Sequence, residues 1–192
     1  MINICEIPQS VPLRVIIGAG EQRWQGWIPT QRDELDLLRP SDWELSFHSR
    51  LADAFLCEHV WEHLTESEGR SAANLCLKYL KPGGFLRCAV PDGNFPNPEY
   101  QKKAQIGGPG QKDHPAADHK IVYDYRLFVD VFASAGFEVD LLEYCDDLGR
   151  FHYNQWSMND GPIYRSLLLD RRNRDGNIGS VSLIVDARKP IK

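Results

Sequence analysis

The stretch Val15-Ile16-Ile17-Gly18-Ala19-Gly20 decides how this chain is expected to fold. A run of β-branched apolar residues is typical of a strand buried on both faces, as in a parallel sheet. The Gly-Ala-Gly that follows lets the backbone turn sharply and approach a ligand with no Cβ in the way. The stretch therefore predicts a central strand over Leu13 to Ile17. The Gly18-Ala19-Gly20 segment after this strand is either a loop that binds a nucleotide-type cofactor or an ordinary turn.

The composition is typical of a globular protein that acts on small molecules. The chain has 192 residues, a formal net charge of −5 and 42% hydrophobic residues, so we expect residues 1–192 to form a single domain. The acidic balance predicts no nucleic-acid partner. No apolar run approaches the roughly 18 residues of a membrane span, and no export signal is recognised. The five cysteines include no CxxC pair, which predicts reduced, mostly buried thiols and a cytoplasmic protein.

Strands and helices are expected to alternate after residue 50, which indicates an α/β sheet with crossovers. Thr65 and Glu68 form a capping box that begins one helix, which Pro82-Gly83-Gly84 is expected to end. Asp124 is expected to cap a second helix that extends to Ala135. Residues 94–120 show no period and are expected to form one long loop, either a lid or a disordered segment. Further strands are expected at Asp53 to Cys57, Phe85 to Val90, Phe137 to Glu143 and Val181 to Ala187.

The front of the chain is too short for a regular crossover. Fewer residues separate Gly20 from Trp27 than the dozen or so that join two parallel strands. Either the first crossover helix is reduced to a turn, or Trp27 to Thr30 is not the second strand. Pro29 adds to the conflict because proline cannot donate to a central sheet ladder.

The segment Glu58-His59-Val60-Trp61-Glu62-His63 supports three interpretations. His59-x-x-Glu62-His63 matches an inverted zinc-peptidase pattern, in which two histidines on a helix bind zinc and the glutamate activates water. The segment, however, lies directly between a strand and a helix cap. A polar junction without chemistry is the second interpretation, and a cofactor loop at the carboxyl end of a strand is the third. We therefore predict no metal ligand.

The chain resembles the class I S-adenosylmethionine-dependent methyltransferases, and within them a small group with a shortened front end. The resemblance rests on five ordered segments between residues 13 and 145: Ile16 to Gly20, Gly26-Trp27-Ile28, Glu58 to Leu64, Leu80-Lys81-Pro82-Gly83-Gly84 and Ala135-Gly136-Phe137. It implies a Rossmann-like, mostly parallel sheet of about seven strands with a reversed final β-hairpin. It also implies S-adenosylmethionine bound over Gly18, Ala19 and Gly20, with Glu58 and His59 at its near face.

One position departs from the family pattern. Members carry an acidic residue at the end of the second strand that accepts hydrogen bonds from the cofactor's ribose, whereas this chain has Gln31. A neutral amide still accepts one such bond but lacks the charge-assisted strength of a carboxylate. Asp33 and Asp36 are alternative partners for the ribose, unless they are ordinary surface charges.

Candidate catalytic residues lie where the carboxyl edge of the sheet is expected. They are His119 and Asp92, with His114, Asp118 and Tyr123 nearby. His119 is preferred as a base because an unperturbed histidine titrates near pH 6.5. A loop histidine without a chemical role is the alternative.

The sequence as a whole predicts methyl transfer to a small-molecule acceptor that it does not identify. No Asn-Pro-Pro-Tyr type motif follows Cys57, which disfavours methylation of nucleic-acid amino groups. A methyltransferase-fold domain that has lost the cofactor is the first alternative. A zinc hydrolase that uses His59, Glu62 and His63 is the second. No oligomeric state is predicted.

Overall fold

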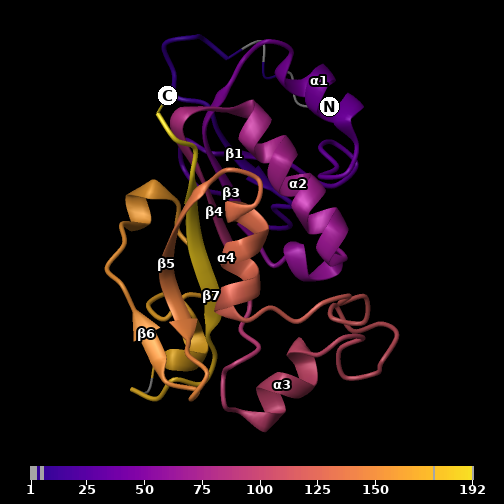
Figure 1. Ribbon diagram of the computed structural model, residues 1–192, viewed down its shortest axis with the longest axis vertical. Coiled ribbons are helices and arrows are strands. Elements are labelled where there is room, and N and C mark those ends of the chain that lie inside the picture. Colours follow the sequence, from indigo (N-terminus) through magenta and orange to yellow (C-terminus); the bar gives the residue numbers. More distant parts are fainter. Residues whose placement is uncertain (1–3, 5–6, 175, 192) are drawn as a thin grey trace.

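The protein is built around one seven-stranded sheet (Figure 1). The computed structural model describes residues 4, 7–174 and 176–191. The strands lie side by side in the order β2-β1-β3-β4-β7-β5-β6. Their bounds are β1 Arg14–Ile17, β2 Ile28–Pro29, β3 Ala52–Glu58, β4 Leu80–Pro91, β5 Glu138–Cys145, β6 Phe151–Tyr153 and β7 Ser182–Arg188.

Five of the seven strands run in the same direction. β1 pairs in parallel with β2 and β3, and β3 pairs in parallel with β4. β7 is antiparallel to both of its neighbours, β4 and β5, and β6 is antiparallel to β5. The expected mostly parallel α/β sheet with a reversed last strand is therefore confirmed.

Three helices cover one face of the sheet: α1 Pro40–Phe47, α2 Glu66–Tyr79 and α4 Tyr125–Ala133. The capping box predicted at the start of α2 is present, since the Thr65 hydroxyl and the Glu68 carboxylate each accept from the other's backbone N–H. The Asp124 carboxylate caps α4 by accepting from the amide of Leu127. α2 packs between α1 and α4, which places this layer directly over the central strands (Figure 1).

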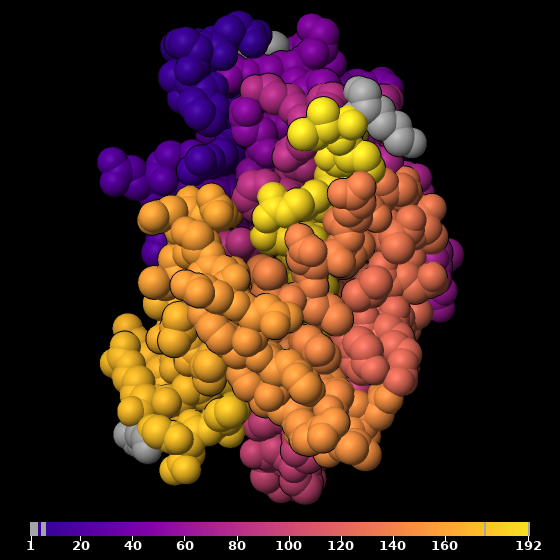
Figure 2. Space-filling view, turned by 60° about the vertical axis from the view of Figure 1, so that its left-hand side comes forward, coloured from indigo at the N-terminus to yellow at the C-terminus, as the bar shows by residue number. Residues whose placement is uncertain are grey.

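The opposite face is covered by irregular chain from the connection between β6 and β7. Ile163 is fully buried there against Ile16, Leu56 and Ile184. Arg87 of β4 holds this cover in place, since it donates to the carbonyl oxygens of Ser157 (2.8 Å) and Gly161 (2.7 Å). Atoms from this C-terminal part of the chain occupy much of the surface in Figure 2.

The conflict at the front of the chain is resolved in favour of a shortened crossover. The connection from β1 to β2 contains turns and no helix, and β2 has only two residues. Val15 pairs with Ile28 and Ile16 with Pro29. Pro29 is tolerated because β2 is the edge strand, where one side needs no ladder hydrogen bonds.

Two sequence expectations are wrong at the level of local structure. Pro82-Gly83-Gly84 does not separate α2 from a later strand, because β4 already begins at Leu80. The glycines lie within an irregularity of the β3–β4 pairing, and a Cβ on Gly84 would come within 2.9 Å of the Asp53 carbonyl oxygen. Residues 94–120 are not one uninterrupted loop either. They contain the helix α3, Pro98–Ala104, which the Asn97 side chain caps.

Four cysteines in the described part of the chain are free and buried: Cys57, Cys76, Cys88 and Cys145. This agrees with the expected reduced thiols, while Cys5 lies outside the described residues. Within the described residues, no helix is both long enough and apolar enough to span a membrane.

Candidate functional site

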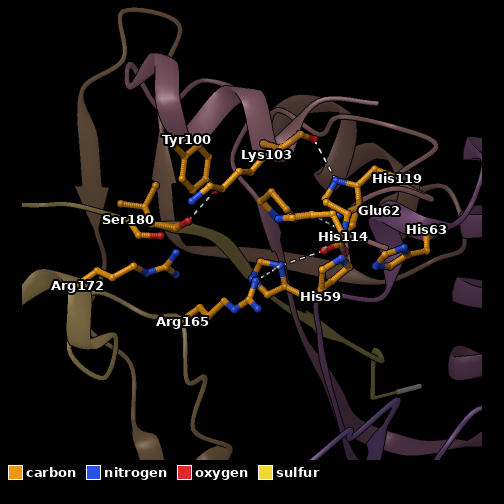
Figure 3. Close-up of a pocket in the computed structure, with 15 residues that line it drawn as sticks. His59, Glu62, His63, Tyr100, Lys103, His114, His119, Arg165, Arg172 and Ser180 are labelled. Atoms are coloured by element: carbon orange, nitrogen blue, oxygen red, sulfur yellow. Dashed lines mark hydrogen bonds and ion pairs between the residues drawn. The ribbon is translucent and has the colours of Figure 1, made fainter. Parts of the chain in front are cut away.

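A cavity of about 480 Å³ opens at the carboxyl ends of β3 and β4 (Figure 3). Its walls come from the turn after β3, from α3 and the loop that follows it, and from the connection before β7. Open α/β sheets bind ligands at this edge. The polar lining residues fall into two groups: an acid–histidine group on one side, and Arg165, Arg172 and Ser180 on the other (Figure 3).

His59 joins the end of β3 to this cavity. Its backbone has φ of +57°, a conformation that L residues with a Cβ adopt rarely. The ring Nδ1 lies 2.9 Å from Glu62 Oε1, and the ring Nε2 lies 3.1 Å from the Ser182 hydroxyl. Both ring nitrogens are therefore engaged, which fixes the ring between the turn and β7.

Glu62 is a buried carboxylate in the short 3₁₀ turn Trp61–His63, with 2% of its surface exposed. Burial opposes its ionisation, but the charge and hydrogen bond of His59 outweigh burial and lower the pKa of Glu62. Its Oε1 interacts with His59, whereas its buried Oε2 has no hydrogen-bond partner among the described residues. Glu62 thus holds a negative charge with one unused acceptor.

His119 reaches the same place from a segment 57 residues further along the chain. Its Nδ1 lies 3.2 Å from the Ala104 carbonyl oxygen, which can only accept, so Nδ1 carries the proton. Burial lowers the pKa of His119, which favours the neutral ring and leaves a lone pair on Nε2. That Nε2 lies 4.0 Å from Glu62 Oε1.

His63 completes the group. Its ring lies 5.0 Å from that of His119, centroid to centroid, and its Nδ1 lies 2.7 Å from the Asp118 carboxylate. One ligand atom each from Glu62, His63 and His119 lies within 4.8 Å of the other two. The grouping differs from the pattern His59-x-x-Glu62-His63 in the sequence, because these residues lie on a strand end and a 3₁₀ turn and not on one α-helix.

The opposite wall of the cavity is cationic. Arg172 is already paired with Asp170, whose carboxylate accepts from its Nε at 2.9 Å. Arg165 forms no ion pair within the described chain, and its guanidinium lies 3.4 Å from His59 Nδ1. Lys103 of α3 also lines the cavity and is likewise without an ion-pair partner in the described part. Positive charge on this wall suits a ligand with an anionic group.

The Gly18-Ala19-Gly20 loop lies outside this cavity, at the end of β1. Gly18 (φ +64°) and Gly20 (φ +52°) both have the positive φ that favours glycine. A Cβ on Gly18 would lie 2.6 Å from Val60 Cγ2, so Gly18 is required by packing against the turn after β3. A Cβ on Gly20 would meet nothing within 4 Å. Of the two glycines, only Gly20 has open space where a Cβ would project.

The other predicted cofactor residues are engaged within the protein. The Glu58 carboxylate accepts from the Gln22 side chain (2.6 Å) and from the amides of Tyr164 and Arg165, both at 2.9 Å. The Gln31 side-chain amide donates to the Gly20 carbonyl oxygen at 2.8 Å.

The contacts and exposure of the two acidic residues near Gln31 do not favour a role in ligand binding. Asp36 accepts from the Leu38 amide at 2.9 Å and also pairs with Arg32, and Asp33 is exposed.

Two buried polar atoms beside the loop have no partner among the described residues. They are Gln22 Oε1, an acceptor, and Trp24 Nε1, a donor. The Trp24 ring packs on that of Tyr164 at 4.7 Å, so the cover over this position comes from the connection between β6 and β7.

Asp92 holds the fold together at the end of β4 and does not line the cavity. Its side chain is fully buried and accepts from the amides of Cys145 (2.6 Å) and Asn94 (2.8 Å). Burial raises its pKa. Among the other histidine, acidic and tyrosine candidates, His114 lines the cavity, Asp118 pairs with His63, and Tyr123 is buried in the core. Sequence reasoning assigned no role to Arg165, because isolated arginines in irregular chain carry no periodic signal.

Comparisons with solved structures define the fold. A scan against protein-family models gave no match, and a search of curated proteins gave none either. One chain of the complex between the Haloferax volcanii Trm112 methyltransferase activator and a methyltransferase aligns with a TM-score of 0.53 and 13% identity. The alignment covers 98% of this chain and 87% of that one.

Two methyltransferases align with TM-scores of 0.51. An O-methyltransferase family protein from Burkholderia thailandensis shares 11% identity over 98% of this chain and 55% of its own. The S-adenosylmethionine-dependent methyltransferase SibL shares 10% identity over 94% of this chain and 51% of its own. This chain thus spans about half the length of these two proteins. It has the fold of the class I S-adenosylmethionine-dependent methyltransferases.

Proposed function

We propose that the protein transfers a methyl group from S-adenosylmethionine to a small-molecule acceptor. The observation that carries this proposal is the Gly18-Ala19-Gly20 loop at the carboxyl end of β1, within a sheet of methyltransferase topology. In such sheets a ligand binds outside the carboxyl ends of the strands. The free thiols support a reducing compartment such as the cytoplasm.

The atoms beside the loop fit the amino-acid end of this cofactor. An α-ammonium group donates hydrogen bonds and an α-carboxylate accepts them. Gln22 Oε1 and Trp24 Nε1 are a buried acceptor and a buried donor without partners in the described chain, and buried polar groups usually have one. Gly20 has open space on its Cβ side, and Gln31, which donates to the Gly20 carbonyl oxygen, and Glu58 remain candidates for the rest of the molecule. Bound there, the cofactor supplies an electrophilic methyl group.

The cavity beside His59 is the proposed acceptor site. Of the two predicted catalytic residues, His119 lines it and Asp92 does not. Because His119 Nδ1 is committed to the Ala104 carbonyl, its Nε2 lone pair is available to remove a proton from an oxygen acceptor. Arg165 would hold an anionic group of the acceptor against the opposite wall.

Gly20→Ala tests the cofactor loop, and Gly26→Ala is its matched control. Both glycines have positive φ, and in both a Cβ would meet nothing within 4 Å. Alanine in this left-handed backbone conformation costs about 1–2 kcal/mol of stability at either position. Only Gly20, however, lies where the cofactor is proposed to bind. Calorimetry with S-adenosylmethionine and its demethylated product should show binding that Gly20→Ala weakens about tenfold or more, and Gly26→Ala much less.

A second candidate is a domain that keeps this fold without using the cofactor. It is favoured by Glu58, whose carboxylate already accepts three hydrogen bonds, from Gln22, Tyr164 and Arg165. The same calorimetry separates the two candidates. If the unaltered protein gives no heat with either compound at about 1 mM, the methyltransferase proposal fails and this candidate stands.

A further inference from the structure

Glu62, His63 and His119 bring one carboxylate and two imidazoles to one wall of the cavity, from two distant parts of the chain (Figure 3). We propose that these three side chains form a binding site for one divalent cation of the zinc class. Two imidazoles and a carboxylate are typical ligands of zinc, and imidazole favours zinc, cobalt, nickel and copper over magnesium or calcium.

The unpartnered oxygen of Glu62 is the strongest sign that this group of side chains binds a cation. Oε2 is buried, and no donor reaches it within the described chain. Oε1 is occupied by His59, which orients the carboxylate. An unpaired buried acceptor of a charged group costs free energy, and a cation at Oε2 would remove that cost.

His119 has an outer partner of the kind that metal-binding histidines use. The Ala104 carbonyl engages Nδ1 of His119 at 3.2 Å. Such a partner sets the tautomer of His119 and leaves its Nε2 free to coordinate. The Asp118 carboxylate lies 2.7 Å from Nδ1 of His63 without forming a hydrogen bond, so this buried nitrogen is a second atom of the trio with no hydrogen-bond partner in the described chain. The ion pair of His63 with Asp118 is not needed for packing, because Asp118 is largely exposed.

The spacing requires a small closure around the ion. Two ligands of a tetrahedral zinc ion, bound at about 2.1 Å each, lie roughly 3.4 Å apart. The ligand atoms here lie within 4.8 Å of one another, so they must approach by an ångström or so. His63 provides this movement most easily, because 27% of its side chain is exposed.

Three protein ligands leave a fourth position for a ligand from the cavity. Sites that keep one position open bind water or substrate there, whereas purely structural zinc sites use four protein ligands. The open position would face the cavity that Arg165 and Lys103 also line. An anionic oxygen ligand would then bridge the cation and the cationic wall.

The cation site does not rest on the proposed methyl transfer. The two share one atom, because a cation on His119 Nε2 would occupy the lone pair that a general base needs. With a cation bound, His119 would be a metal ligand and not a general base. The cation would then polarise the methyl acceptor. Cofactor binding at Gly20 is unaffected by either assignment.

The test is titration of the metal-stripped chain, without a histidine tag, with Zn²⁺ by calorimetry and with Co²⁺ by visible absorption. We expect one saturable equivalent per chain, and an absorption band of tetrahedral or five-coordinate Co²⁺. His119→Ala should weaken Zn²⁺ binding more than about 100-fold, since even the loss of outer partners costs 10–100-fold. His114→Ala is the matched control, because His114 lines the same cavity outside the trio.

Glu62→Gln provides the second variant and keeps the shape of the side chain. It should also abolish tight binding, and circular dichroism should confirm that each variant folds. If Glu62→Gln does not fold, the Zn²⁺ affinities of His119→Ala and His114→Ala are sufficient to test the proposal. The proposal is overturned if the unaltered protein binds no stoichiometric Zn²⁺. It is equally overturned if His119→Ala binds like the unaltered protein, or if His114→Ala weakens binding as much as His119→Ala.

Discussion

Arg87→Met should destabilise the protein more than any other single change on the helix-free face of the sheet. Arg87 is 1% exposed and donates from Nε and Nη2 to both carboxylate oxygens of Asp186, at 2.8 and 2.9 Å. Its remaining nitrogen donates to the carbonyl oxygens of Ser157 and Gly161. Methionine fills a similar volume but replaces none of these hydrogen bonds.

The expected loss is about 4 kcal/mol of unfolding free energy. Removing one partner of a buried ion pair typically costs about 3–5 kcal/mol, because the other charge stays buried. Asp186 keeps one hydrogen bond from Arg188 at 3.0 Å, which reduces the loss. The carbonyls of Ser157 and Gly161 lose their donor, which increases it. For a chain of this length the change corresponds to a fall in Tm of roughly 8–16 °C.

Urea unfolding followed by circular dichroism measures this loss, with Arg188→Met as the control. Arg188 bonds to the same carboxylate but is 43% exposed, so its removal should cost less than about 1 kcal/mol. Hydrogen exchange should also quicken in the cover around Gly161 in Arg87→Met only. If the two variants differ by less than about 1 kcal/mol, or if exchange near Gly161 is unchanged, the anchoring role of Arg87 is refuted.

Two further predictions concern the loop after β1 and the start of α2. Gly18→Ala should lower Tm more than Gly20→Ala, since both gain backbone strain but only Gly18 would clash with Val60, and adding Val60→Ala should recover part of the difference. Equal Tm values for Gly18→Ala and Gly20→Ala would contradict this. The Thr65 amide and Lys120 lower the pKa of Glu68 to about 2, so its charge stabilises the fold above about pH 4.5 and this contribution is lost as pH falls toward 2. The Tm difference between the unaltered protein and Glu68→Gln should therefore shrink over that interval, and a constant difference would count against the capping interaction.

The sheet could be predicted from the sequence because its strands carry local signals. β1, β3 and β7 are mainly apolar runs and β5 alternates polar and apolar residues, and all four were expected within two residues of their observed bounds. The helix caps Thr65 and Asp124 were readable for the same reason, since a cap depends only on the next few residues.

Elements whose ends depend on distant contacts were missed. α1 begins with Pro40 and α3 follows the Asn97 cap, yet both are short and their apolar spacing is weak. β6 has three residues and exists only by pairing with β5. In each case tertiary packing, and not local preference, selects the structure.

The cavity could be predicted only in part. His59 and His119 were candidates from their residue types and their expected edge of the sheet. Their meeting with Glu62 depends on the path of the loop after α3, where the Lys120 amide donates to the Glu62 carbonyl oxygen at 2.8 Å. No local pattern in the sequence encodes that contact across 58 residues.

The two-residue strand β2 has a consequence for how this protein behaves at high concentration. The outer strand of a sheet usually presents free N–H and C=O groups that can pair with another molecule and start an aggregate. β2 gives such a partner only Ile28 and Pro29, and Pro29 has no N–H; at the far side, β6 is only three residues long. A chain with a shortened front half can thus keep a sheet that does not extend from one molecule to the next.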